Sequence, residues 1–229
     1  MIVLPARNEA PRIASVVEEV RRCLPGVPIL VVENGSQDQT GEVALAAGAV
    51  VLRSAPGYAR ALQVGFVHAL REGAPWVIQM DADGQHPATA LPLLLEALER
   101  CDLAVGSRFL GAGGYQMPLP RKLAVQALGG WASLWSGSRL RDVTSGLRAW
   151  RRDALVRIVE DFPQEIADAN LLVRALRRGL VVTEVPVAMR VRAGGRSQHQ
   201  LPRAALFAAK MAALTVAEAT GGYGRTNTK

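Results

Sequence analysis

The chain has 229 residues, enough for one sizeable core, and its 49% hydrophobic and 21% charged residues are ordinary for a globular protein. This composition excludes a largely disordered chain, and the two cysteines are too few for a disulfide-stapled scaffold and fit a reducing cytosol. The net charge of +7 suggests an anionic partner, although charge for solubility explains it equally. Arg-rich runs with interleaved aromatic residues are lacking, so we expect no nucleic-acid partner.

The chain opens with an apolar segment, residues 1–4, that runs straight into the polar residues 5–9. This segment is too short for a signal peptide. The most apolar stretch, 201–217, is interrupted by Arg203 and Lys210, and no stretch reaches the about 20 apolar residues that a spanning helix needs. We therefore expect a cytoplasmic protein that meets a membrane only peripherally, at its inner face.

Strand and helix patterns alternate over the first hundred residues. After a first strand that ends near residue 5, apolar runs typical of strands covered on both faces occur at 27–32, 49–52, 76–80 and, more weakly, 103–106. Two segments between them carry apolar residues on one helical face: Ile13, Val16, Val17, Val20 and Leu24 in the first, and Leu91, Leu94, Leu95 and Leu98 in the second. This alternation predicts an α/β fold with a mainly parallel central sheet flanked by helices, whose ligands gather at the carboxyl ends of the strands.

The pattern changes after residue 109. The expected elements are a glycine-rich connection at 111–114, a helix at 119–136, a strand at 142–150, a helix through 171–178, a last strand at 181–191 and a terminal helix at 201–220. In the helix at 119–136 Trp131 and Trp135 share the apolar face, with Arg121 and Lys122 nearby. This helix suits a membrane interface, or it packs its tryptophans into the core, and the sequence favours neither.

Asp81 and Asp83 directly follow the strand at 76–80. Two carboxylates spaced in this way at a strand's end can both reach one divalent cation, and Mg²⁺ or Mn²⁺ prefers such oxygen ligands and completes its shell with substrate phosphates. Gln85 adds a neutral oxygen on the same side, and His86 can either join the site or support the loop. A bare Asp-x-Asp would favour a solvated turn, but an apolar strand leading into this set of residues favours a metal site.

Polar residues also follow the first two strands. In residues 5–9, Arg7 and the N–H groups of the next helix can bind phosphate and ribose, with ordinary helix capping as the alternative. In residues 33–40 the acids can accept hydrogen bonds from a nucleobase or ribose, although Asp38 is equally suited to cap the next helix. Further along, Arg60 can turn toward a diphosphate or form a surface ion pair.

Seven segments, in order along nearly the whole chain, resemble glycosyltransferase family 2 on the GT-A fold. They are LPARNEA, VVENGSQDQT, GYARALQVGFVHA, QMDADGQHP, GSRF, RDVTSGLRAWRRDAL and EVPVAMRVRAGGRS. The middle and later segments look most like the polyprenyl-phosphate sugar transferases, the dolichyl-phosphate mannosyl- and glucosyltransferase branch. The resemblance implies one GT-A domain at 1–220, with a nucleotide-sugar-binding half at 1–110, an acceptor-side half at 111–220, and a disordered tail at 221–229.

The resemblance also implies roles for individual residues. Donor binding is expected of Pro5, Ala6, Arg7, Glu9, Glu33, Asp38, Arg60, Asp81 and Ala82. Metal binding is expected of Asp81, Asp83 and Gln85. Contact with the transferred or acceptor phosphate is expected of Arg108, Arg192 and Ser197, and the candidate catalytic residues are Asp83, Asp168 and Glu165.

Two departures from the family pattern leave questions open. The family usually has two aspartates where this chain has Glu33 and Asn34, so the choice of donor is not fixed. The family often has an acid about ten residues before the glycine that matches Gly179, where this chain has Asn170. The general base that a hydroxyl acceptor would require is therefore not assigned.

The resemblance predicts a metal-dependent, inverting transferase that uses Mg²⁺ or Mn²⁺ and a GDP- or UDP-sugar. The expected acceptor is a polyprenyl or dolichyl phosphate, which needs no base because a phosphate is already an anion at neutral pH. A soluble saccharide or metabolite acceptor is one alternative, and a catalytically silent GT-A domain that only binds nucleotide is another. A Rossmann dehydrogenase is excluded, because no G-x-G-x-x-G follows the first strand.

Overall fold

The computed structural model describes residues 1–111, 117–190 and 201–221, and a seven-stranded sheet in the order β3-β2-β1-β4-β6-β5-β7 lies at its centre. The strands are β1 (Ile2–Ala6), β2 (Ile29–Glu33), β3 (Val50–Arg53), β4 (Trp76–Gln79), β5 (Leu103–Ser107), β6 (Arg148–Arg151) and β7 (Val182–Pro186). The helices are α1 (Ala10–Cys23), α2 (Thr40–Ala46), α3 (Tyr58–Arg71), the 3₁₀ helix η1 (Ala88–Ala90), α4 (Leu91–Ala97), α5 (Leu119–Ser136), α6 (Arg152–Val159), α7 (Ala169–Arg177) and α8 (Leu201–Ala219).

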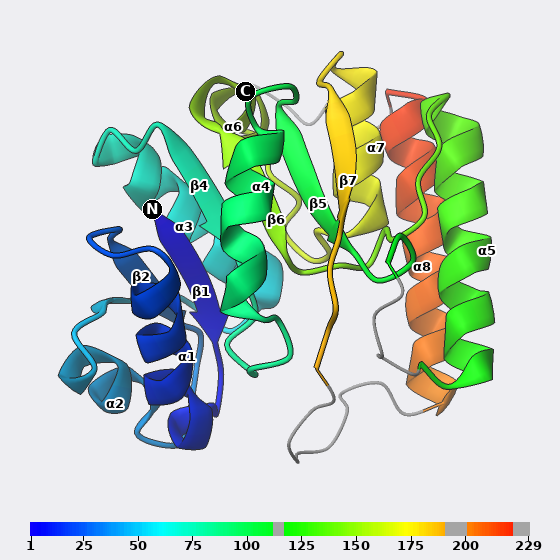
Figure 1. The fold of residues 1–229 in the computed structure, drawn as a ribbon. Coiled ribbons are helices and arrows are strands. Elements are labelled where there is room, and N and C mark those ends of the chain that lie inside the picture. The colour runs from blue at the N-terminus through cyan, green and yellow to red at the C-terminus, as the bar shows by residue number, and fades with distance from the viewer. Residues whose placement is uncertain (112–116, 191–200, 222–229) are drawn as a thin grey trace, which may run out of the picture.

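All strands of this sheet except β6 run in the same direction. β1 pairs in parallel with β2 and β4, β2 with β3, and β5 with β7, whereas β6 lies antiparallel between β4 and β5. The carboxyl ends of the parallel strands therefore meet at one edge of the sheet, the lower edge in Figure 1. This arrangement confirms the predicted α/β fold with a mainly parallel sheet.

Helices cover both faces of the sheet. α1, α2 and α4 enclose one hydrophobic cluster, and α3, α6 and α7 enclose the other. β1 supplies both clusters, because Val3 faces the second while Ile2 and Leu4 face the first, as the alternation of side chains along a strand requires. α5 and α8 pack against each other and against α7, at the right of Figure 1. None of the helices described is both long and apolar enough to cross a membrane.

Several predicted elements agree with the structure. The strands expected in the first hundred residues are present within about two residues of the predicted bounds, and α5 has the predicted bounds. The predicted apolar face of α1 is buried, at Ile13, Val16, Val17 and Val20. The helix expected after residues 33–40 is α2, whereas the short helix α6 was not predicted.

Two predicted strands were too long. The strand expected at 142–150 begins only at Arg148, because earlier backbone groups bond to side chains instead: the N–H of Asp142 donates to Glu184, and the carbonyl oxygen of Gly146 accepts from Gln79. The strand expected at 181–191 ends at Pro186. Beyond it, the N–H of Arg190 donates to the carbonyl oxygen of Gln85 (2.8 Å), so the chain leaves the sheet and runs beside the loop after β4.

Candidate active site

Asp81 lies at the carboxyl end of β4 and is held from two sides. The Tyr58 hydroxyl, at the start of α3, donates to Oδ1 of Asp81 (2.8 Å), and Nε2 of His86 donates to Oδ2 (3.2 Å). Burial by itself raises the pKa of Asp81, but the bonds from His86 and Tyr58 and the nearby Arg148 guanidinium hold this pKa below its ordinary value. The carboxylate is therefore an oriented anion before any ligand arrives.

Gly146 packs directly against this carboxylate. A β-carbon at Gly146 would lie 2.4 Å from Oδ2 and 2.7 Å from Oδ1 of Asp81, closer than side chains tolerate. Gly146 belongs to the loop that enters β6, and its carbonyl oxygen accepts from the Gln79 side chain (3.3 Å), which in turn accepts from the indole N–H of Trp150 (3.2 Å). The wall behind Asp81 is thus a buried, hydrogen-bonded part of the sheet.

Asp83 and Gln85 complete the acidic loop. Oδ1 of Asp83 accepts from the backbone N–H of Gln85 (3.0 Å), and the side-chain amide of Gln85 donates to the carbonyl oxygen of Arg190 (3.4 Å). In the described part of the chain no three His, Cys, Asp or Glu side chains converge as a ready-made metal site. Two carboxylates and one amide oxygen still suit a hard cation that takes its remaining ligands from substrate phosphates.

Hydrogen bonds connect the loop after β1 to the loop after β2. The backbone of Asn8 has a left-handed φ of 56°, and its side-chain oxygen accepts from the N–H of Gln37 (2.7 Å). The N–H of Glu9 donates to the Thr40 hydroxyl (2.8 Å). Asp38 accepts from the N–H groups of Ala10 (3.1 Å) and Thr40 (3.0 Å), the first residues of α1 and α2, although the N-cap positions of these helices are Glu9 and Gln39. The Asp38 carboxylate thus bonds to the backbone at the starts of both helices.

The remaining candidates on the donor side differ in exposure. Pro5 and Ala6 are buried within β1, and Ala82 is buried in the loop after β4. Arg7 and Arg60 are exposed, the latter in the first turn of α3.

The acids among them are engaged locally. The Glu33 carboxylate accepts from the N–H of Ser36 and lies 3.8 Å from Nε of Arg53, while Glu9 pairs with Arg12 (3.1 Å).

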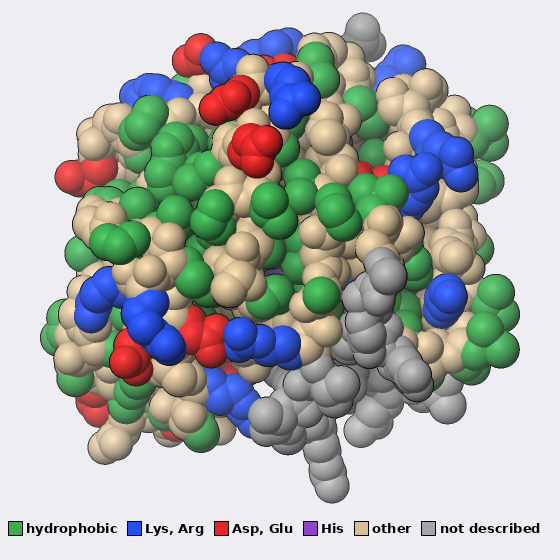
Figure 2. Space-filling view, viewed as in Figure 1, with side chains coloured by type: hydrophobic (Ala, Val, Ile, Leu, Met, Phe, Trp, Pro, Cys, Tyr) green, Lys and Arg blue, Asp and Glu red, His purple; other side chains and the backbone are tan. Residues whose placement is uncertain are grey.

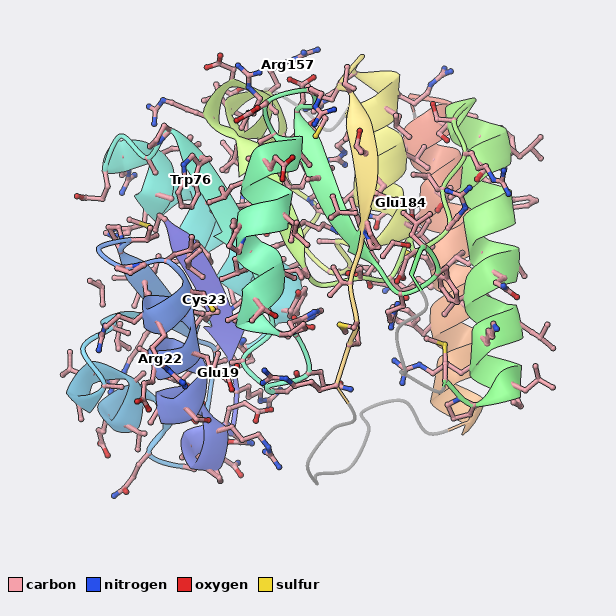
Figure 3. The ribbon with its side chains drawn as sticks, viewed as in Figure 1. Glu19, Arg22, Cys23, Trp76, Arg157 and Glu184 are labelled. Carbon is pink, nitrogen blue, oxygen red and sulfur yellow. The ribbon has the colours of Figure 1, made fainter. Side chains whose placement is uncertain are left out.

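Arg108, expected at the acceptor phosphate, forms a largely buried ion pair. Its guanidinium donates to both oxygens of Asp142 and to the Thr144 hydroxyl. Asp142 is positioned in turn by Glu184, which is labelled in Figure 3 and projects from β7. The Glu184 carboxylate accepts from the backbone N–H groups of Arg141 and Asp142. Arg192 and Ser197, the other two residues of this prediction, lie outside the described residues.

Arg148 lies beside the half-buried Asp168, and both interact electrostatically with Asp81. Arg148 is fully buried and donates to the carbonyl oxygens of Ala167 (2.9 Å) and Val143 (3.3 Å), with Asp168 Oδ1 at 3.9 Å from its Nη2. Burial raises the pKa of Asp168 to about 6, against the opposing attraction of Arg148. Glu165 differs: it is exposed and ion-paired with Lys210 of α8. The structure thus brings Asp168, and not Glu165, into the buried charge network around Asp81.

The sequence reasoning missed several residues of this site: Tyr58, Asp142, Gly146, Arg148 and Glu184. Four of them lie in segments that carried the family resemblance, RDVTSGLRAWRRDAL and EVPVAMRVRAGGRS, and Tyr58 lies in GYARALQVGFVHA. The sequence of each segment was enough to show the family resemblance. The contacts of these residues were not predictable, because their partners lie in distant parts of the chain.

Comparison with known proteins agrees with this arrangement. The sequence pattern of Glycosyl transferase family 2 matches residues 1–139. The polyprenol monophosphomannose synthase of Mycolicibacterium smegmatis is 33% identical over 86% of this chain and 80% of its own length. The undecaprenyl-phosphate mannosyltransferase of Micrococcus luteus is 31% identical over 86% of both chains, and the dolichyl-phosphate hexose transferase of Haloferax volcanii 32% over 84% and 83%.

Solved structures share the fold. Glucosyl-3-phosphoglycerate synthase from Mycobacterium tuberculosis, crystallised with Mn²⁺, uridine diphosphate and phosphoglyceric acid, superposes with a TM-score of 0.74. The match covers 99% of this chain and 79% of the synthase, at 20% sequence identity. This similarity confirms the expected GT-A architecture.

Proposed function

Since the chain belongs to glycosyl transferase family 2, we propose that it transfers a sugar from a nucleotide-sugar to a polyprenyl phosphate, with inversion at the anomeric carbon. The observation that carries this proposal is the oriented Asp81 beside Asp83, at the edge where the strand ends meet. The names of the relatives support a lipid phosphate as acceptor, because they include mannosyl- and hexosyltransferases of three polyprenyl phosphates.

Asp81, Asp83 and Gln85 would hold a divalent cation, Mg²⁺ or Mn²⁺. When bound, such a cation neutralises the charge that develops on the departing nucleoside diphosphate. Arg7, directly after β1, and Arg60, in the first turn of α3, are both exposed, and the proposal assigns them to the diphosphate. A carboxylate that is held in place before the substrate arrives costs no reorganisation during the reaction, which is why it lowers the barrier.

Two of the positions considered for a general base are engaged in local contacts, and a phosphate acceptor needs no base. Asn170 stands where the family pattern often has an acid. Its side chain accepts from the N–H of Asp168 (3.1 Å) and donates to the carbonyl oxygen of Ile166 (2.8 Å). Glu165 is paired with Lys210 on the surface. A phosphate attacks as an anion without losing a proton, so this arrangement suffices for it. For a hydroxyl acceptor, Asp168 would be the base.

Peripheral membrane contact through α5 is part of the proposal. Leu119, Leu123 and Leu134 are 67%, 57% and 74% exposed, and hydrophobic side chains stand out along the right-hand rim of Figure 2, where α5 lies. α5 contains no acidic residue and carries exposed Arg121 and Lys122, which suits an anionic lipid surface. The start of α5 lies toward the edge of the sheet that carries Asp81 (Figure 1).

The tryptophans of α5 contribute to this contact unequally. Trp135 packs against the hydrophobic core, whereas Trp131 is 39% exposed and donates from its indole N–H to the carbonyl oxygen of Ala212 in α8 (3.3 Å). Trp131 is therefore the tryptophan available to a bilayer interface.

The test is a transfer assay with the full chain, Mn²⁺ or Mg²⁺, and a panel of GDP- and UDP-sugars. The acceptors are undecaprenyl phosphate, soluble saccharides and phosphoglycerate, with Asp83→Ala as the inactive control. We expect transfer to the polyprenyl phosphate from one donor, with the anomeric configuration inverted in the product by NMR. Transfer only to a soluble acceptor would contradict the acceptor assignment, retention would contradict the single displacement, and no transfer at all would favour a silent nucleotide-binding domain.

A further inference from the structure

Tyr58 lies between the hydrophobic core and the acidic loop, and its hydroxyl forms the contact with the loop. Its ring packs against the core cluster that contains α3, and its hydroxyl reaches Asp81 Oδ1 at 2.8 Å. Gly57, at φ 140°, allows the chain to turn sharply into α3 immediately before this residue. The tyrosine is therefore rigid at its base, and its hydroxyl is presented to the carboxylate at a fixed position.

The other contacts of Asp81 leave its carboxylate no freedom to rotate. Oδ2 accepts from Nε2 of His86, which is itself buried, and the Gly146 backbone lies against both oxygens. Three separate segments thus set one carboxylate plane. Each oxygen has a second lone pair, so the bonds to Tyr58 and His86 orient Asp81 without exhausting its capacity to accept.

We propose that Tyr58 is a positioning residue of the cation site, whose hydroxyl holds Asp81 in the orientation in which it binds the cation. This inference rests on the proposed use of a divalent cation by Asp81 and Asp83. The physical reason is general: groups that hydrogen-bond to a metal ligand fix its orientation, and losing one costs about 10- to 100-fold in metal affinity. Without the Tyr58 hydroxyl, the Asp81 carboxylate becomes ordered only when the cation binds, and the entropy lost in that step weakens cation binding.

The location of Tyr58 adds a second consequence. Tyr58 and the exposed Arg60 lie in the same first turn of α3. The turn that orients the carboxylate therefore also presents a cation to the donor diphosphate, and a shift of α3 would change both together. Tyr58 was not among the residues that the sequence assigned to the site, because a tyrosine in an apolar helix face is ordinarily a core residue.

The test is a titration of Mn²⁺ at saturating UDP or GDP, whichever the wild type binds, with free Mn²⁺ measured by electron paramagnetic resonance. We expect Tyr58→Phe to raise the Kd for Mn²⁺ about 10- to 100-fold, while nucleotide affinity in EDTA stays within about twofold. Excess Mn²⁺ should restore the kcat of transfer. Ser54→Ala is the matched control, since it also removes one hydroxyl, in the loop after β3, where the Ser54 hydroxyl donates to the carbonyl oxygen of the neighbouring Ala55 (3.1 Å).

A double-mutant cycle identifies the route of the effect. If Tyr58 acts through Asp81, Tyr58→Phe adds little to the loss of Mn²⁺ affinity in Asp81→Asn. Wild-type Mn²⁺ affinity in Tyr58→Phe would overturn the inference and leave the cation site intact. Full additivity, or a loss of activity that excess Mn²⁺ does not restore, would also overturn it, since either indicates a role in the fold alone. If the wild type itself binds no Mn²⁺ with nucleotide, the proposed function fails, and the role of Tyr58 fails with it.

Discussion

Gly146→Ala tests whether the packing around Asp81 matters for function. The added β-carbon would lie 2.4 Å from Oδ2 and 2.7 Å from Oδ1 of Asp81, so the carboxylate must move by roughly 1 Å to restore ordinary contact distances. Misplacement of a reacting or ligating group by about 1 Å can cost on the order of 100-fold in rate. Gly146 does not have a positive φ, so alanine introduces no backbone strain and the perturbation is confined to this contact.

We expect Gly146→Ala to lose about 100-fold in kcat/KM for transfer and to weaken Mn²⁺-dependent nucleotide binding. Stability should fall by only about 1–3 kcal/mol, the usual cost of overpacking, as measured by urea unfolding. Gly130→Ala is the control, because a β-carbon there meets nothing within 4 Å and lies within α5, where alanine should stabilise the helix by about 0.5–1 kcal/mol. Wild-type transfer and Mn²⁺ binding by a folded Gly146→Ala protein would refute the reasoning.

Three further predictions concern Asp168, the α7–α8 contact and α5. Burial raises the pKa of Asp168 from 3.8 to about 6, so between these pH values the folded protein binds a proton that the unfolded chain does not, and its stability falls as pH rises through them. Asp168→Asn should therefore raise the free energy of unfolding by about 2–3 kcal/mol at pH 7 and leave it unchanged near pH 3.5. A stabilisation independent of pH in urea unfolding would contradict this. Glu218→Ala removes the carboxylate that pairs with the buried Arg174 and should cost about 3 kcal/mol, so a loss under about 1 kcal/mol would show that the pair does not hold α8. Leu119→Ser with Leu123→Ser (67% and 57% exposed) should abolish co-sedimentation with anionic vesicles at low salt. The control pair Leu45→Ser with Leu93→Ser (64% and 47% exposed), which lies outside α5, should not, and equal effects of the two pairs would exclude α5 as the contact.

Local patterns were sufficient for most of the fold. The bounds of α5 and the buried face of α1 follow from helical periodicity, and the loops at the strand ends follow from the rule that parallel strands end at one edge. That rule also placed Asp81 and Asp83 correctly, at the end of β4.

What the sequence could not supply are polar contacts between distant segments. Arg108 and Asp142 are 34 residues apart and Tyr58 and Asp81 are 23 apart, and no periodic pattern links such pairs. The overlong strand predicted at 142–150 has the same cause: its apolar and β-branched residues suit a strand, but bonds to Arg108 and Glu184 hold Asp142 away from the sheet. Propensity was overridden there by tertiary contacts.

We propose that the edge formed by the ends of β1, β2 and β4 is a cation-dependent nucleotide site. It is tested most directly by the melting temperature of wild type and Asp83→Ala with a panel of nucleoside diphosphates, with and without Mn²⁺. A ligand that binds only the folded protein raises the melting temperature as its concentration passes its Kd. We predict a rise with one nucleotide that requires Mn²⁺ and is lost in Asp83→Ala. No rise with any nucleotide, or the same rise in Asp83→Ala, would contradict the account.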